Sequence, residues 1–249
     1  MVLLTRLVHL SKSFNAQSSM KIYMNTRQLK KEIFKLLSAP DIQECLESLE
    51  AIPARQAVNP LFSFLYNTDP VIKWHAVSAM GHIVANLADK DLELSRVIMR
   101  RMIWNLNDES GGIGWGSPET MGDSMACHNL LAGEYHRILI SYIRPDGNFL
   151  EHPELQKGLL WGLARLATVH PELAGDAGPF LVPFLESKDA EHRGLAALAA
   201  GAMQADSARK ALENITSDRK KIVLYWNLNF NKMSVGELVE NALKSFQNC

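Results

Sequence analysis

Two stretches decide the fold, 69-DPVIKWHAVSAMGHI-83 and 189-DAEHRGLAALAAGAM-203, because they carry the same pattern. Each begins with an aspartate that can cap a helix, has alanine at positions eight and eleven, and has glycine at position thirteen. Two further stretches align with them without gaps, 117-SPETMGDSMACHNLL-131 and 152-HPELQKGLLWGLARL-166. Small residues at such spacing let neighbouring helices approach closely. The pattern therefore predicts four helices stacked side by side.

The four stretches begin at residues 69, 117, 152 and 189, so successive starts lie 48, 35 and 37 residues apart. A period of about 40 residues with two helices per unit is typical of helical-repeat solenoids. Each stretch is preceded by a segment with helical periodicity, and a shorter pair of helices is expected upstream as an N-terminal cap. The preceding segments are 53–67, 91–107, 132–143 and 171–187, and the upstream pair is 26–38 and 41–52.

The repeat pattern ends before the C-terminus. The stretch 220-KKIVLYW-226 is rich in β-branched and aromatic residues, and 233-MSVGELVENALKSF-246 reads as a helix capped by serine. We expect a short hairpin and a closing helix that shield the apolar face of the last repeat. The expected organisation is a weakly docked extension over 1–24, a solenoid over 25–215 and a cap over 216–249.

The amino-acid composition of the chain limits the classes of molecule that it is expected to bind. Lys and Arg number 26 against 27 Asp and Glu, and the net charge of −1 disfavours broad attraction to nucleic acid or anionic membranes. No apolar run reaches 18 residues, so no membrane span is expected. The N-terminal stretch lacks the basic start of a secretion signal, and three widely spaced cysteines favour reduced thiols. These features predict a cytoplasmic protein.

The frames Asp69–Gly81 and Asp189–Gly201 resemble those of HEAT-repeat proteins, in particular the HEAT-like repeats named after phycobilisome lyases. The resemblance covers roughly residues 27–215. The stretches 107-NDESGGIGWGSPE-119 and 235-VGELVENAL-243 are also similar to a small group of bacterial HEAT-like proteins. The resemblance implies an all-α, right-handed α-solenoid of about five HEAT-like hairpins that binds partners. It carries over no catalytic residue and no cofactor.

The longest interval contains a glycine-rich insertion loop at 107–117. Its spacing differs from GxGxxG and it follows a predicted helix, which disfavours a phosphate-binding loop. One interpretation is a structural edge loop; the other is a functional loop on the solenoid rim that contacts a partner. Under the second interpretation, the partner-binding candidates are the acidic residues and tryptophans in and near the loop, together with one later tryptophan: Asp108, Glu109, Trp115, Glu119, Trp104 and Trp161.

Other chemistry finds little support in the sequence. The cysteines and histidines lack the spacing of known zinc motifs, and no nucleophile motif appears, so neither metal ligands nor catalytic residues are predicted. One class of alkylpurine DNA glycosylases is built from HEAT-like repeats, and Trp104 and Asp108 lie on one helical face. The alternative for Trp104 and Trp161 is packing between helix layers. Lys73 and Arg193 share the fifth repeat position and could bond loop carbonyls or acids of the next unit.

We therefore predict a non-enzymatic scaffold that binds another protein through its concave face and the 107–117 rim loop. The alternative is a HEAT-like enzyme, either a lyase acting on a protein-bound cofactor or an alkylpurine DNA glycosylase. No small-molecule ligand is indicated by the sequence.

Overall fold

The computed structural model describes residues 25–108 and 114–247 of the chain. The expectation for residues 1–24, the candidate Glu109 and the middle of the insertion loop lie outside the described residues.

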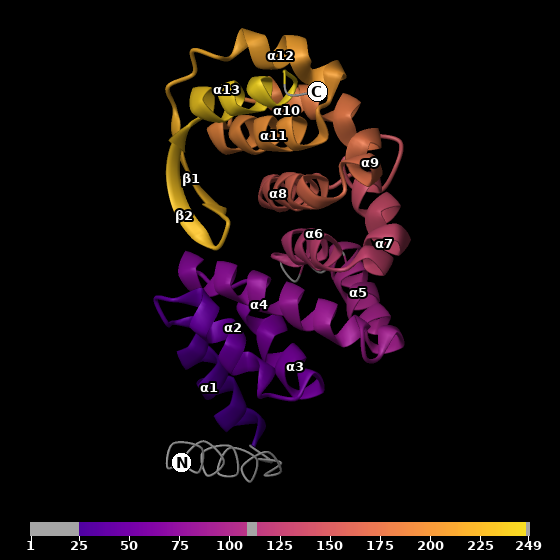
Figure 1. The fold of residues 1–249 in the computed structure, drawn as a ribbon, viewed down its shortest axis with the longest axis vertical. Helices are drawn as coiled ribbons and strands as arrows, with labels where there is room; N and C mark the ends of the chain where they lie inside the picture. Colours follow the sequence, from indigo (N-terminus) through magenta and orange to yellow (C-terminus); the bar gives the residue numbers. More distant parts are fainter. Residues whose placement is uncertain (1–24, 109–113, 248–249) are drawn as a thin grey trace, which may run out of the picture.

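The described residues form five helical pairs followed by a cap (Figure 1). The first four pairs are α1 (Thr26–Leu37) with α2 (Ile42–Glu50), α3 (Ala54–Phe64) with α4 (Pro70–Ala88), α5 (Leu92–Leu106) with α6 (Ser117–Cys127), and α7 (Asn129–Ser141) with α8 (Pro153–Val169). In the fifth pair the outer member is broken into α9 (Pro171–Ala174), the 3-10 turn η1 (Gly175–Leu181) and α10 (Val182–Leu185), and the inner member is α11 (Ala190–Met203). The cap consists of the 3-10 turn η2 (Asp206–Ala208), α12 (Arg209–Asn214), β1 (Lys221–Trp226), β2 (Asn229–Ser234) and α13 (Val235–Ser245).

The helices α4, α6, α8, α11 and α13 stack on one another as an inner layer, with α5, α7 and α9 outside them (Figure 1). The first four inner helices are the four aligned stretches of the sequence. Asp69, His152 and Asp189 each cap one of these helices by accepting a hydrogen bond from a backbone N–H two residues on. The predicted all-α solenoid with a small hairpin and a closing helix is confirmed.

The helix α6 departs from the repeat pattern at both ends. Ser117 lies inside the helix, and the preceding Gly116 is the N-cap residue, with a left-handed φ of 77°. A side chain at Gly116 would meet the backbone of Leu65, so only glycine fits this turn. At the other end His128 has extended backbone angles and divides α6 from α7. The aligned stretch 117–131 therefore spans two helices.

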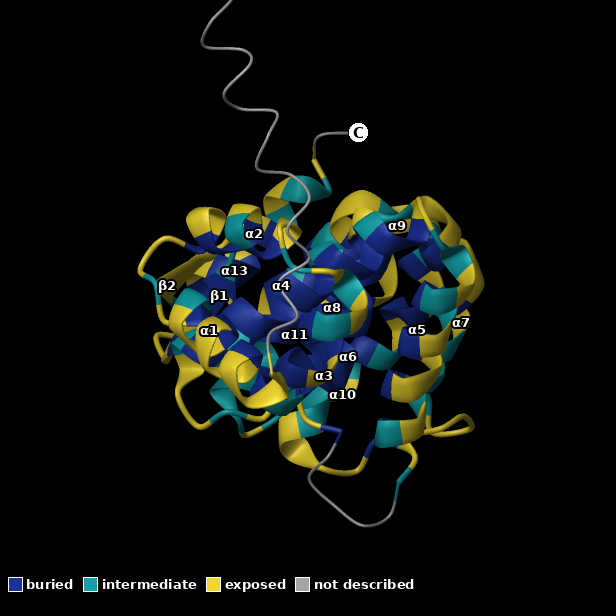
Figure 2. Cartoon of the chain, turned by 90° about the horizontal axis from the view of Figure 1, so that it is seen from below, coloured by how far each residue is buried: buried dark blue, intermediate teal, exposed yellow. Residues whose placement is uncertain are grey.

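The inner helices meet through glycines, and one of them, Gly162, occupies the eleventh position of its aligned stretch. A Cβ on Gly122 of α6 would collide with the backbone of Gly162 in α8, and a Cβ on Gly162 would collide with the carbonyl of Pro118. This close approach leaves the middle of the stack without room for larger side chains. Figure 2 shows that α4, α6, α8 and α11 are mostly buried, whereas exposed residues lie on the outer side of α5 and α7.

The hairpin extends farther than predicted. Its strands pair antiparallel with Tyr225 opposite Phe230, and Asn227 and Leu228 form the turn with positive φ values of 50° and 63°. It covers more than the last repeat, because it runs along the inner layer past α11 and α8 to the edge of α4 (Figure 1). Long-range contacts made by β1 hold the hairpin along this path.

Candidate functional site

An aromatic cluster joins the hairpin to the inner helices. Tyr225 stacks on Trp74 of α4 with ring centroids 5.1 Å apart, and Trp74 lies 4.9 Å from Trp161 of α8. The indole Nε1 of Trp161 donates a hydrogen bond of 2.7 Å to the Tyr225 carbonyl, and Trp226 packs edge-on against the Trp161 ring. The Tyr225 hydroxyl lies 3.0 Å from the Ser78 hydroxyl of α4. The middle of the concave face is thus filled by the protein's own strand.

Two cavities flank this cluster, and Trp161 and Tyr225 line both of them. The first cavity, which we call the rim cavity, has a volume of about 510 Å³ and lies where the inner helices begin. Trp74, Trp161, Tyr225 and Phe230 form its apolar wall, and its charged lining residues are Lys73, Glu119, Glu154, Lys157 and Glu191.

The charged residues of the rim cavity connect one repeat to the next. Lys73 Nζ of α4 lies 2.9 Å from Glu119 Oε1 of α6, and Lys157 Nζ of α8 lies 2.7 Å from Glu191 Oε2 of α11. Burial works to lower the pKa of Lys73, but the nearby glutamates outweigh it and the pKa lies above its ordinary value. Lys73 therefore stays protonated at neutral pH, although its side chain is only 27 % exposed.

The predicted contacts of the fifth repeat position occur at both residues. Lys73 bonds an acid of the next inner helix, whereas Arg193 donates to the carbonyls of Ser187 and Lys188. Arg193 also pairs with Asp218 at 2.6 Å, which holds the chain just before β1.

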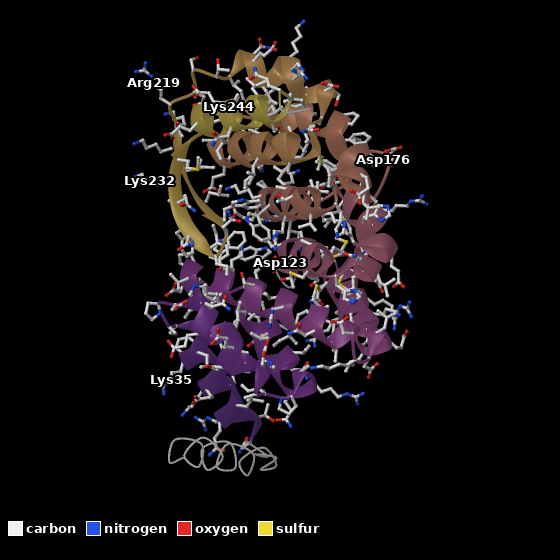
Figure 3. All side chains as sticks on the ribbon, viewed as in Figure 1. Lys35, Asp123, Asp176, Arg219, Lys232 and Lys244 are labelled. Atoms are coloured by element: carbon white, nitrogen blue, oxygen red, sulfur yellow. The ribbon has the colours of Figure 1, made fainter. Side chains whose placement is uncertain are left out.

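The second cavity has a volume of about 370 Å³ and contains a buried ion pair. Arg165 Nε of α8 donates a hydrogen bond of 2.7 Å to Asp123 Oδ1 of α6. Burial raises the pKa of Asp123, although Arg165 acts against this. Figure 3 shows Asp123 inside the molecule between α6 and the hairpin, while Arg219 and Lys232 project outward. Asp123 is therefore a structural partner of Arg165 rather than a solvated acid.

Cys127 also lines the second cavity, and its environment makes it a weak nucleophile. Although Cys127 is exposed at the surface, desolvation by the surrounding protein and the nearby Asp123 raise its pKa to about 11, in spite of Arg165. The thiolate is the reactive form of cysteine. At neutral pH this side chain is protonated, which disfavours nucleophilic catalysis.

The structure brings together two of the six partner-binding candidates. Glu119 and Trp161 both line the rim cavity, where they are 2 % and 3 % exposed. Trp115 lies just before α6 with its ring centroid 6.0 Å from that of His152, and it is 41 % exposed outside the cavity.

The remaining candidates lie elsewhere or outside the described residues. Trp104 is on the outer helix α5 and is 63 % exposed, so it neither packs between helix layers nor faces the concave side. Asp108 follows the end of the same helix and is partly buried, and Glu109 is not among the described residues. The pairing of Trp104 with Asp108 thus lacks the concave-face position that the glycosylase alternative requires.

Several residues of the site were not singled out from the sequence. They are Trp74, Asp123, Lys157, Arg165 and Tyr225. Helical spacing held part of the signal, because Asp123 follows Glu119 by four residues and Arg165 follows Trp161 by four. Tyr225 gave no such signal, since its position depends on the path of the hairpin.

The described residues contain neither a cluster of metal ligands nor a membrane-spanning helix. No group of three or more His, Cys, Asp or Glu side chains there could hold a metal ion. No helix in the same part of the chain has both the length and the apolar character needed to cross a bilayer.

The fold of the chain is similar to that of several solved structures. The chain is similar to two engineered proteins whose crystal structures come from the Northeast Structural Genomics Consortium. The first has a TM-score of 0.52 and 18 % identity, covering 90 % of this chain and 97 % of the other. The second has a TM-score of 0.51 and 16 % identity, covering 88 % of this chain and 58 % of the other.

A designed armadillo repeat protein also matches, with a TM-score of 0.46 and 19 % identity over 88 % of this chain and 99 % of the other. No protein-family model and no curated protein matches the chain. At these identities the likeness concerns architecture alone, a solenoid of helical repeats.

Proposed function

We propose that this chain is a non-enzymatic, protein-binding scaffold of HEAT-type repeats that acts in the bacterial cytoplasm. We place its docking surface on the rim where α4, α6, α8 and α11 begin. This surface is narrower than the whole concave face, because the hairpin covers the middle of that face.

One observation carries the proposal. The rim combines a cavity of about 510 Å³, lined by aromatic and charged side chains, with the exposed Trp115 beside it. Protein-binding surfaces are enriched in aromatic anchors surrounded by polar groups.

The enzyme alternatives have less support. The basis for the glycosylase was the pair Trp104 and Asp108, which lies at the end of an outer helix. For a lyase, no activated nucleophile faces either cavity among the described residues, and Cys127 has a raised pKa. Binding without turnover accounts for the rim with fewer assumptions.

The test compares variants as baits in native lysate of the source organism. Trp115→Ala and Glu191→Lys alter the rim, and Trp104→Ala is the matched control on the outer face. We expect one stoichiometric partner to bind wild type and the Trp104→Ala variant, and to be lost from both rim variants.

Retention by the rim variants, or absence of any stoichiometric partner, would contradict the proposal. Excision of alkylated bases by the purified protein, lost in Asp108→Asn, would instead favour the glycosylase.

A further inference from the structure

The rim cavity has an excess of negative charge. Its two lysines face three carboxylates of the lining, since Lys73 pairs with Glu119 while Lys157 contacts Glu154 at 2.8 Å and Glu191 at 2.7 Å. Lys157 also contacts Asp189, outside the lining, at 3.2 Å. Glu119, Glu154 and Glu191 each occupy the first turn of an inner helix. The favourable interaction of a carboxylate with a helix N-terminus explains the exposed Glu154 and Glu191. It does not explain the burial of Glu119.

One carboxylate oxygen of Glu119 is buried without a hydrogen-bond donor among the described residues. The Glu119 side chain is 2 % exposed, and its Oε2 atom accepts no hydrogen bond from any of the described residues. This oxygen lies over Gly158 of α8, where any larger residue would place its Cβ on the carboxylate. A buried carboxylate oxygen without a donor is costly. This oxygen can accept a hydrogen bond from a ligand, and the excess of acids favours a cationic donor.

The aromatic wall completes the chemistry of a cation site. Lys73 Nζ already lies 5.2 Å from the Trp74 ring centroid, so one ammonium group makes both an ion pair and a cation–π contact here. Phe230, which is 38 % exposed, belongs to the same wall, whereas Trp161 and Tyr225 are almost fully buried. Trp74 and Phe230 thus offer an apolar surface for an alkyl chain whose charged end points toward the carboxylates.

We propose that the rim cavity binds an alkylammonium or alkylguanidinium group, supplied by a lysine or arginine side chain of a partner protein. The charged group donates to Glu119 beside Lys73 after a small rotation of the carboxylate, and Glu154 and Glu191 attract it at the mouth. This inference rests on the proposed function for the source of the group. The shared chemistry is also found in free alkylguanidines such as agmatine.

The first experiment measures binding by isothermal titration calorimetry to the full chain. The probes are agmatine and two capped tripeptides, Gly-Arg-Gly and its citrulline counterpart, which keeps the shape and removes the charge. We expect the arginine peptide to bind, the citrulline peptide to fail, and affinity to fall with added salt. Tighter binding of agmatine than of the peptide would assign the site to a free alkylguanidine and overturn the partner side chain as its source.

Variants locate the site. Glu119→Gln removes one charged acceptor, so it should weaken binding of the arginine peptide about tenfold or more. Glu134→Gln on the outer helix α7 is the matched control and should leave binding unchanged. Lys73→Met removes the internal ammonium group, so it should strengthen binding and make the probe raise the melting temperature more than in wild type.

Equal affinity of wild type and Glu119→Gln, with circular dichroism showing both folded, would overturn the inference. Weaker binding in Lys73→Met would overturn it as well, because it would assign recognition to the lysine. These results are independent of the lysate experiment. A partner retained at the rim without cation binding would leave the scaffold proposal intact and contradict the cation site. Cation binding without a captured partner would contradict the scaffold proposal and leave the cation site intact.

Discussion

At the residue scale, the ion pair between Arg165 and Asp123 shows how burial governs the charges of this protein. Asp123 is 10 % exposed and Arg165 is 29 % exposed, and they are joined by a hydrogen bond of 2.7 Å. Removing one partner of a buried pair leaves the other charge without compensation. The loss of folding stability then depends on whether the remaining group can become neutral.

We expect Arg165→Met to destabilise the fold by about 3 kcal/mol at neutral pH, the low end for a buried pair because Arg165 is partly exposed. The pKa of Asp123 is already raised by burial, and without Arg165 it rises further. A raised pKa in the folded state favours folding below the unfolded value of about 3.9, and this contribution is lost as pH rises through the folded pKa. Urea unfolding should therefore show a larger loss at pH 8 than at pH 5.

The double variant Asp123→Asn with Arg165→Met is the control, since it has no unpaired charge and should recover most of the stability. An equal loss at both pH values would contradict the assignment of the effect to Asp123.

At the element scale, glycines set the distance between inner helices. Gly162 of α8 faces the carbonyl of Pro118, a backbone atom that cannot move aside. Gly133 of α7 has no atom within 4 Å of the position that a Cβ would take. The same substitution should thus have opposite effects in the two helices.

We expect Gly162→Ala to lower the free energy of unfolding by about 1–3 kcal/mol through overpacking. Gly133→Ala should raise it by about 0.5–1 kcal/mol, because alanine favours the helix over glycine. Chemical denaturation followed by circular dichroism measures both. A neutral Gly162→Ala would mean that α6 and α8 are free to separate.

The sequence pattern predicted the helices well because the small residues that form it are the ones that set the distance between helices. Close helix packing requires small residues at fixed spacing, so the frames beginning at Asp69 and Asp189 located the inner layer directly. The sequence pattern predicted the ends of α6 less well, because the turn at Gly116 and the break at His128 depend on contacts with neighbouring units. The ion pairs were partly predictable, as the repeat position of Lys73 shows.

At the scale of the whole molecule, the hairpin ties distant repeats together. In most solenoids each repeat contacts only its neighbours. Here Tyr225 and Ser78, 147 residues apart in the chain, approach to 3.0 Å. No local pattern in the sequence specifies such a contact, which is why the expected path of the hairpin was too short.

Tyr225→Ala should destabilise the protein by about 3–5 kcal/mol, as for other buried aromatic residues. It should also make unfolding less cooperative, because the first two helical pairs lose their link to the C-terminal half. Transitions followed by circular dichroism and by tryptophan fluorescence should then no longer coincide. Val223→Ala, at a position 60 % exposed on the outer side of β1, is the control and should change neither. Coincident transitions in Tyr225→Ala would show that neighbouring contacts alone couple the repeats.

The reach of the hairpin also fixes the size of the array. Solenoids commonly gain or lose units by duplication and deletion, since every junction is alike. In this chain an extra unit between α4 and α11 would carry Ser78 and Trp74 away from Tyr225, and a missing unit would drive them into it. The length of the hairpin therefore matches one number of repeats, and that number can change only if the length of the hairpin changes with it.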